Sequence, residues 1–259
     1  MVIQAKAKFP SQLRIWQQNL NRSFNAQMHV LNSADPAEWD LLLFQEPWLD
    51  YLRNTRANIH WRVVYPPSHF DDGSPPTRSV ILVNTSISSD FWEALPTPTS
   101  DITAIKIKTD SGLVSIFNLY VDCSNNSSIT DLLDFLNNNY PNYEPNSREH
   151  LVWCGDFNRH HLMWEEQRNA HLFSREAEVR PLIDLANQFC MTVQLPPGIP
   201  TLESLATGNW TRPDNVWCSM HTTDFFITCD VNPEIQPPNS DHLPIICHLD
   251  LSVRRLPTP

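Results

Sequence analysis

The stretch LVWCGDFNRHH, residues 151–161, passes from an apolar segment directly into a cluster of polar side chains. Two kinds of site fit this cluster: a metal site built on His160 and His161, or a phosphate-processing site built on Asp156 and Asn158. Adjacent histidines in a strand-like loop point to opposite sides. Neither an H-E-x-x-H spacing nor a clustered third ligand accompanies them. The pattern therefore favours the aspartate and the asparagine, with the histidines shaping the loop or contacting substrate.

Three further motifs also place polar residues beside an apolar, strand-like run. They are QQNLNRS with Asn19 and Asn21, LLLFQEPWL with Glu46, and NSDHLPIICHL with Ser240, Asp241 and His242. Loops at strand ends are the usual places where a rigid sheet presents functional groups. Each motif alone is weak, because polar loop residues more often cap or brace the backbone.

Together the motifs supply the groups that phosphodiester hydrolysis requires. Glu46 and Asp241 offer hard oxygen ligands for a divalent cation. Asp156, beside the amide of Asn158, is suited to orient or deprotonate a water molecule. The combined pattern predicts metal-assisted hydrolysis.

The same chemistry needs a hydrogen-bond donor on the non-bridging phosphate oxygens, which suits His242. This histidine works best with a carboxylate that fixes its tautomer, and Asp224 in the strand-like run TTDFF is the expected partner. Ser240 lacks a Gly-x-Ser-x-Gly elbow, so we expect it to brace its loop and not to act as a nucleophile.

Short strand-like runs must position these residues, and they occur at residues 13–19, 40–45, 61–66, 78–84, 151–157, 222–229 and 243–251. Residues 102–120 alternate apolar and polar side chains around a turn at 110–112, which predicts a hairpin. Helices are predicted at residues 25–33, at 128–139 with Ser128 as N-cap, and at 180–190 with Pro181 near the start. Hairpins mixed with helical crossovers indicate two sheets packed face to face with helices outside, and not a doubly wound parallel sheet. We expect a single domain over residues 1–259, with its core at about 13–251.

Composition supports a sizeable core, since 41% of the residues are hydrophobic. The chain has 29 acidic and 18 basic residues, a net charge of −11, which argues against passive DNA binding. It does not argue against metal-assisted hydrolysis, because a divalent cation changes the local sign of the charge.

The cysteines and the N-terminus indicate an intracellular protein. The six cysteines include no CxxC pair, so we expect reduced, mostly buried thiols and no structural zinc. The segment MVIQAKAKFPSQLRIW lacks the apolar stretch of a signal peptide, and no run approaches the roughly 20 apolar residues of a membrane span.

The ordered set QNLN, LLFQEPW, NLY, GDFN, TTDFF and SDHLPI resembles the endonuclease/exonuclease/phosphatase superfamily, from about Leu13 to Leu251. More closely, it resembles the apurinic-type endonuclease domain of non-LTR (LINE-like) retrotransposons. The resemblance implies a DNase I-like, four-layer αββα sandwich that uses Mg²⁺, with Mn²⁺ as a substitute. It implies an endonuclease that nicks one DNA strand and leaves a 3′-hydroxyl, as in target-primed reverse transcription. The implied setting is a monomeric, nuclear protein linked to a reverse transcriptase in a larger polyprotein.

The resemblance also assigns roles to positions. Asp156 matches the water-activating aspartate and Asn158 its partner, while His242 matches the histidine that stabilises the charged transition state, with Asp224 orienting it. Tyr120, at the end of FNLY, matches a tyrosine that contacts the scissile phosphate. The matched metal-site residues are Glu46, Asn19 and Asp241, and the candidate substrate contacts are Asn21, Thr211 and Ser240.

One motif departs from the family pattern. Relatives commonly read YAPN after the tyrosine, whereas this chain reads YVDC, so Cys123 replaces an asparagine that Asn125 or Asn126 would have to supply. The alternatives to a DNA endonuclease are a phosphomonoesterase or small-molecule phosphodiesterase of the same superfamily, and a catalytically inactive remnant.

Overall fold

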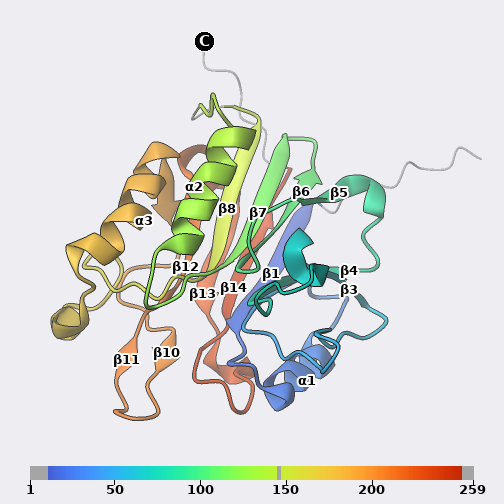
Figure 1. Ribbon diagram of the computed structural model, residues 1–259. Coiled ribbons are helices and arrows are strands. Elements are labelled where there is room, and N and C mark those ends of the chain that lie inside the picture. Colours follow the sequence, from blue (N-terminus) through green and yellow to red (C-terminus); the bar gives the residue numbers. More distant parts are fainter. Residues whose placement is uncertain (1–10, 145–146, 253–259) are drawn as a thin grey trace, which may run out of the picture.

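Apolar side chains alternate along the central strands in a way that serves two cores at once. In β1 (Gln12–Asn19), Leu13 and Ile15 point into one core, whereas Trp16 points into another. Successive side chains of a strand point to opposite faces, so such a strand needs a cover on both sides. The structure, a computed structural model that describes residues 11–144 and 147–252, meets this need with two sheets and three α-helices (Figure 1).

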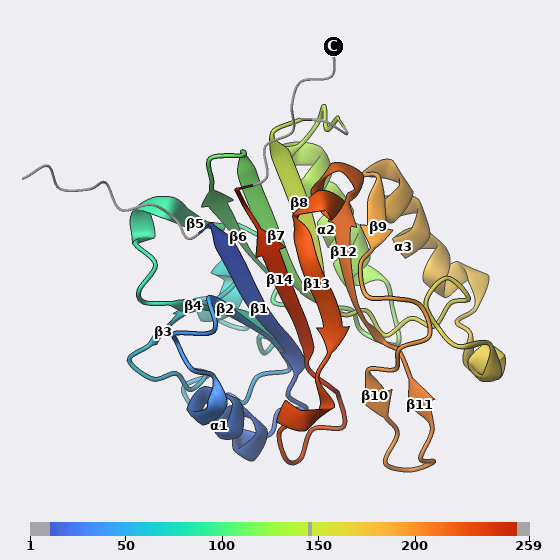
Figure 2. The ribbon, with the colours of Figure 1, turned by 180° about the vertical axis from the view of Figure 1, so that it is seen from behind.

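The first sheet contains β1, β2 (Leu41–Gln45), β3 (Trp61–Val64), β4 (Ser79–Asn84), β13 (Phe226–Val231) and β14 (Ile245–Asp250). Its strand order is β13-β14-β1-β2-β4-β3 (Figure 2). The neighbours β1 and β2 are parallel and the other pairs are antiparallel, so the sheet is mixed.

The second sheet contains β5 (Trp92–Leu95), β6 (Ile102–Lys108), β7 (Leu113–Tyr120), β8 (Glu149–Asp156), β9 (Met191–Val193) and β12 (Asp214–Ser219). Its order is β5-β6-β7-β8-β12-β9, and only the neighbours β7 and β8 are parallel within it. Strands β6 and β7 form the predicted hairpin. A separate two-stranded hairpin, β10 (Leu202–Glu203) and β11 (Trp210–Thr211), projects from one end of the sandwich (Figure 2).

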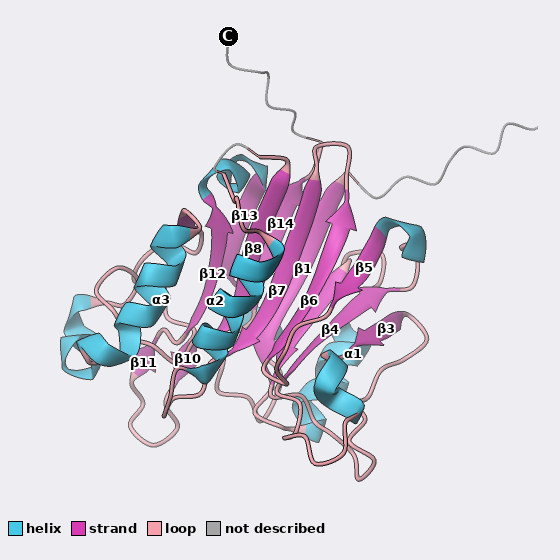
Figure 3. Ribbon diagram, turned by 45° about the horizontal axis from the view of Figure 1, so that its top comes forward, coloured by secondary structure: helices cyan, strands magenta, loops and turns pink. Residues whose placement is uncertain are grey.

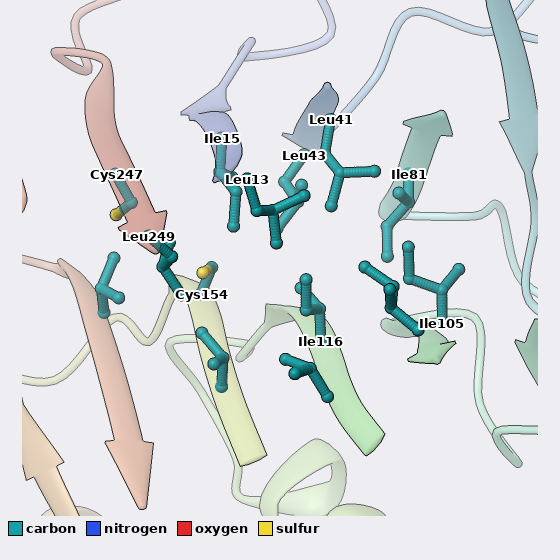
Figure 4. Close-up of a cluster of buried hydrophobic side chains, with 14 of the residues drawn as sticks. Leu13, Ile15, Leu41, Leu43, Ile81, Ile105, Ile116, Cys154, Cys247 and Leu249 are labelled. Carbon is teal, nitrogen blue, oxygen red and sulfur yellow. The ribbon is translucent and has the colours of Figure 1, made fainter. Parts of the chain in front are cut away.

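Helices cover the outer faces of the two sheets. Helix α1 (Phe24–Ser33) packs on the first sheet, and α2 (Ser127–Asn139) and α3 (Glu176–Gln188) pack on the second (Figure 3). Between the sheets lies a core of mostly aliphatic side chains (Figure 4). This arrangement confirms the predicted four-layer αββα sandwich of two mixed sheets.

Short 3₁₀ helices complete the chain at η1 (Pro67–Phe70), η2 (Ser89–Phe91), η3 (Gln167–Leu172), η4 (Met220–Phe225) and η5 (Pro233–Ile235). Within the described residues, every helix is too short or too polar to span a membrane. The first ten residues, where a signal peptide would begin, lie outside the described residues.

Two helix starts differ from the prediction. Asn126, and not Ser128, is the N-cap of α2, because the Ser128 hydroxyl donates to Asp101 instead (2.9 Å). Helix α3 begins at residue 176, so Pro181 lies in its second turn and lacks the N–H that would bond Ala177 O. That carbonyl accepts from the side-chain amide of Asn126 at 3.3 Å, which offsets part of the loss.

The strand ends that carry the polar motifs meet at one end of the sandwich. Asn19 and Gln45 end the parallel strands β1 and β2, and Tyr120 and Asp156 end the parallel strands β7 and β8. Asp214 begins β12, directly opposite Asp156 in the antiparallel register. Parallel strands place their carboxyl ends at one edge, so the topology itself gathers the predicted site.

Candidate active site

Asp156 and Asn19 form the first link between the two sheets at this end. The Asn19 amide Nδ2 donates to Asp156 Oδ2 at 2.9 Å, and the other carboxylate oxygen accepts from the backbone N–H of Asn158 at 3.0 Å. Asp156 is 2% exposed, and this burial, together with the negative charge of Asp214, raises its pKa to about 7. A carboxyl with this pKa exchanges its proton near neutral pH, which suits a general base.

The second link is the pair formed by His242 and Asp214. Asp214 Oδ2 lies 2.8 Å from His242 Nδ1 and also accepts from the Thr201 hydroxyl at 2.7 Å. Burial lowers the pKa of His242, but the charge and hydrogen bond of Asp214, followed by the charge of Asp156, outweigh it and raise that pKa to about 9. The geometry holds a protonated imidazole, with Nδ1 directed at Asp214.

The prediction that Asp224 orients this histidine is wrong, because Asp214 occupies that position. The residues TTDF lie in η4 and not in a strand, and Asp224 is exposed there. The available signal was the sequence RPDNVWC, in which Asp214 precedes a run that forms β12. Its carboxylate at a strand end follows the same pattern as the other motifs.

Glu46 lies beside the loop that follows Asn19, and its backbone is hydrogen-bonded to the backbones of Arg22 and Arg78. Its side chain is 14% exposed, and Oε1 accepts from the Arg22 guanidinium. The Glu46 N–H donates to Arg78 O at 2.8 Å, and its carbonyl accepts from Arg22 N at 2.8 Å. Glu46 has a positive φ of 44°, a conformation uncommon for residues other than glycine.

Tyr120 is half-buried beneath the guanidinium of Arg78, whose Cζ lies 4.6 Å from the ring centroid. Burial raises the pKa of the Tyr120 hydroxyl, and the negative charges of Glu46 and Asp156 raise it further. The hydroxyl therefore stays protonated and lies in the field of both carboxylates. It is available as a hydrogen-bond donor at this end of the sandwich.

The loop that carries Ser240, Asp241 and His242 is fastened to the first strand. The Ser240 hydroxyl donates to Asn19 O at 2.8 Å, which is the bracing role expected for it. His242 Nε2 lies 3.9 Å from Asp241 Oδ1, and Gln18 Nε2 donates to the carbonyl of His242 at 3.0 Å. These contacts bring the motifs of β1 and β14 together.

Buried amides tie the two sheets together behind these residues. Gln17 Nε2 donates to Gln45 Oε1 at 3.1 Å, and Gln45 in turn donates to Asn118 Oδ1 across the sheet interface. Asn118 Nδ2 donates to the carbonyls of Phe44 and Val80, at 2.9 and 2.8 Å. Because buried polar groups require partners, this chain of amides fixes how the sheets sit relative to each other.

The other candidate substrate contacts remain predictions. Asn21 is exposed next to the site, with its N–H donating to Asn19 Oδ1 at 2.8 Å. Thr211 is 6% exposed in β11, and its carbonyl accepts from Thr201 at 2.9 Å. The β10–β11 hairpin is joined to the site through a backbone bridge between Leu202 and His242.

Neither His160 nor His161 belongs to any group of three metal-binding side chains among residues 11–144 and 147–252. His160 Nδ1 lies 2.8 Å from the Glu165 carboxylate, and the His161 ring lies 5.2 Å from the ring of Trp164. These contacts are those of side chains that shape a loop.

Arg159, in the same GDFNRHH stretch, is a positioning residue that the sequence did not reveal. Its guanidinium donates to the carbonyls of Asp122 and Asn125 and to the side chain of Asn126. The side chain of Asn158 also holds this loop, by donating to Val121 O at 3.0 Å. Asn125 and Asn126 thus take part in the structure of the loop that follows Tyr120, and Cys123 is exposed on it.

One group of three donor side chains among the described residues is close enough together to be tested as a site for a divalent cation. Ligand atoms of Asp156, Asp214 and His242 lie within 4.8 Å of one another, and Asp214 Oδ1, although buried, makes no hydrogen bond to any described residue. A histidine that keeps its proton is not a ligand, so this set suits a metal only after His242 is deprotonated. Glu46 and Asp241 offer oxygens without that requirement.

The His242 pair predicts a titration that is measurable without any metal. In the presence of a chelator, the NMR signals of the His242 ring should titrate with a pKa of about 9, and Asp214→Asn should bring that pKa back toward the ordinary 6.5. Because the folded-state pKa is raised, the pair stabilises the fold fully below pH 6.5 and loses this contribution as the pH rises through about 9. A wild-type pKa near 6.5 would contradict the assignment of Asp214.

Several solved structures share the fold of this chain. The endonuclease domain of TRAS1, a telomere-specific non-LTR retrotransposon, superposes with a TM-score of 0.71 and 18% identity, over 93% of this chain and all of that domain. The AP endonuclease LMAP from Leishmania major gives 0.70 and 14%, over 92% of this chain and 88% of that one. A 3′-5′ exonuclease from Neisseria meningitidis gives 0.62 and 18%, over 92% and 100%.

Sequence comparison gives the family. A search of curated proteins returned no match. The family model described as endonuclease-reverse transcriptase matches residues 114–246, just over half of the chain, including Tyr120, Asp156, Asp214 and His242. The predicted resemblance is confirmed, and the chain belongs to the endonuclease-reverse transcriptase family.

Proposed function

We propose that the protein is a divalent-metal-dependent DNA endonuclease that nicks one strand and leaves a 3′-hydroxyl. The observation that carries this proposal is the pairing of Asn19 with Asp156 and of Asp214 with His242 at one end of the sandwich. The first pair supplies the carboxylate of Asp156, whose pKa is about 7, and the second supplies the protonated imidazole of His242, whose pKa is about 9. Phosphodiester hydrolysis needs a base for the attacking water and a hydrogen-bond donor for the charge that develops on the non-bridging oxygens.

Each residue then has a role. Asp156, held by Asn19, orients the attacking water and accepts its proton. His242, kept protonated by Asp214, donates to a non-bridging phosphate oxygen, where negative charge develops. Tyr120 donates a hydrogen bond from its hydroxyl to the same phosphate group.

Glu46 and Asp241, with the amide of Asn19 beside them, are the residues proposed to hold Mg²⁺, or Mn²⁺ in its place. The metal supplies Lewis-acid stabilisation of the charge on the phosphate and leaving group. Oxygen ligands are those that Mg²⁺ prefers, which favours this set over one that contains His242. The cation also offsets the local negative charge, so that an acidic protein can approach DNA.

The wider setting is part of the same proposal. The chain acts as a single, monomeric domain in the nucleus, joined to or acting with a reverse transcriptase that uses the 3′-hydroxyl as a primer. Asn21 and Thr211 contact the DNA beside the scissile phosphate.

Incubation of purified protein with supercoiled plasmid and Mg²⁺ tests the function. We expect relaxed circles with Mg²⁺ or Mn²⁺ and none with EDTA, and a loss of at least about 100-fold for Asp156→Ala and for His242→Ala, because each removes a group acting in the transition state. Arg180→Ala on α3, which breaks only surface ion pairs, is the matched control and should nick normally. Nicking that survives EDTA or both active-site variants would reject the proposal. Release of phosphate from a monoester without nicking would support the phosphatase alternative.

A further inference from the structure

Arg22 and Glu46 form an ion pair at the rim of the site. The Arg22 guanidinium donates to Glu46 Oε1 through Nη2 at 2.6 Å and through Nε at 3.0 Å. The Glu46 side chain is 14% exposed, whereas the Arg22 side chain is 69% exposed. The cation therefore covers, from the solvent side, the carboxylate proposed to bind the metal.

The backbone is bent to make this contact. Asn21 and Arg22 have φ values of 49° and 52°, and Glu46 has 44°. Two consecutive residues other than glycine in the left-handed region are uncommon, and such conformations concentrate at functional sites. Hydrogen bonds from Leu20 N to Gln45 O and from Arg22 N to Glu46 O, at 2.9 and 2.8 Å, hold the bend.

Arg78, a second arginine close to the site, is held more firmly than Arg22. It donates to both oxygens of Asp101 and to Asp122, it lies over the ring of Tyr120, and its side chain is 24% exposed. Arg22 is held at its charged end by one oxygen of one carboxylate. An exposed ion pair of this kind opens at little cost, so Arg22 is the cation that is able to move.

We propose that Arg22 is an exchangeable counter-ion, which neutralises Glu46 before the metal arrives and then moves to a phosphate of the DNA strand. This inference rests on the proposed function, because it takes Glu46 as a metal ligand. A divalent cation competes with Arg22 for the same carboxylate oxygen. The released guanidinium is suited to pair with a phosphate through two parallel N–H donors.

Calorimetry of metal binding tests the exchange without any measurement of activity. Arg22→Ala removes the competitor, so its dissociation constant for Mn²⁺ or Mg²⁺ should fall about 3- to 10-fold, as expected when a neighbouring positive charge is lost. Arg22→Lys keeps the charge and should bind metal much as the wild type does. Arg180→Ala, whose side chain is 61% exposed and also ion-paired, should leave metal affinity unchanged.

Two more measurements complete the design. The NMR signal of the Arg22 Nε–H in the wild-type protein should shift when metal is added, and the signal of Arg180 should not. With Mg²⁺ present, in an Asp156→Ala background that prevents nicking, Arg22→Ala should weaken binding to duplex DNA and reduce the salt dependence by about one phosphate contact. In EDTA, where Arg22 stays paired with Glu46, the same substitution should change DNA binding little.

The outcomes separate the two proposals. Unchanged or weaker metal binding by Arg22→Ala, in a protein whose wild type nicks plasmid, overturns the exchange and leaves the endonuclease intact. Tighter metal binding by Arg22→Ala, in a protein that never nicks, supports the exchange and rejects the endonuclease. A wild type that binds no divalent cation rejects both.

Discussion

Asp214→Asn should lower the rate of plasmid nicking about 10³- to 10⁴-fold, with little loss of DNA affinity. The asparagine keeps the shape but cannot hold His242 Nδ1 as a protonated donor, and in triads of similar geometry this change costs about 10⁴. Asp214 is fully buried and its Oδ2 binds both His242 and Thr201, so no nearby group replaces it. The rate should be measured by single-turnover nicking at saturating protein.

Asp224→Asn is the matched control, because it removes the same charge from an exposed residue of η4. We expect its rate to stay within about twofold of the wild type, as for a surface substitution. If Asp224→Asn were the inactive variant and Asp214→Asn the active one, the assignment of the positioning carboxylate would be reversed.

Gly155→Ala should unfold the protein or destabilise it by more than about 4 kcal/mol, the range of severe core lesions. Gly155 precedes Asp156 in β8 and lies opposite Leu119 in the register with β7. An added Cβ would overlap the carbonyl oxygen of Leu119 and lie 2.8 Å from its carbon, and backbone atoms inside a sheet cannot move aside. Denaturant unfolding followed by circular dichroism measures the loss.

Gly73→Ala provides the comparison, since Gly73 has a φ of 77° but nothing within 4 Å of the added Cβ. It should cost only about 1 kcal/mol, from the left-handed conformation alone. Equal effects of the two substitutions would show that backbone conformation, and not the contact with Leu119, explains the glycine of the GDFN motif.

Much of the fold could be predicted because the central strands carry a strong local signal. Apolar runs that end in polar residues placed β1, β2, β7, β8 and β14 close to their observed bounds. The sequence therefore placed each of these polar motifs correctly at the end of its strand. Small differences, such as the start of α3 four residues early, reflect capping contacts that form only after folding.

The pairing of His242 with Asp214 was harder to predict, because the signal for Asp214 in RPDNVWC is weak beside that of TTDFF. Two aromatic residues made TTDFF resemble a strand, whereas residues 220–225 form a 3₁₀ helix and β13 begins at Phe226. Asp214 precedes a run that includes Asn215, Trp217 and Cys218, so it did not stand out as a strand start. Its position depends on β12 lying antiparallel to β8, and such a long-range pairing has no local sequence signal.

The contacts of Arg22 are a second feature that could not be predicted from the sequence. The motif QQNLNRS shows that an arginine follows two asparagines, but the left-handed backbone at Asn21 and Arg22 is what turns its side chain over Glu46. Neither residue is a glycine, and Asn21 alone, although asparagine adopts this conformation more readily than most residues, is too weak a signal to predict it.

The most direct test of the central claim is a plasmid nicking reaction in which the nicked product is then offered to a DNA polymerase without any treatment of its ends. We predict Mg²⁺-dependent relaxed circles that the polymerase extends, because the reaction leaves a 3′-hydroxyl, and no such circles with EDTA or with Asp214→Asn. Circles that form in EDTA, or nicks that the polymerase extends only after a phosphatase removes a 3′-phosphate, would contradict the account.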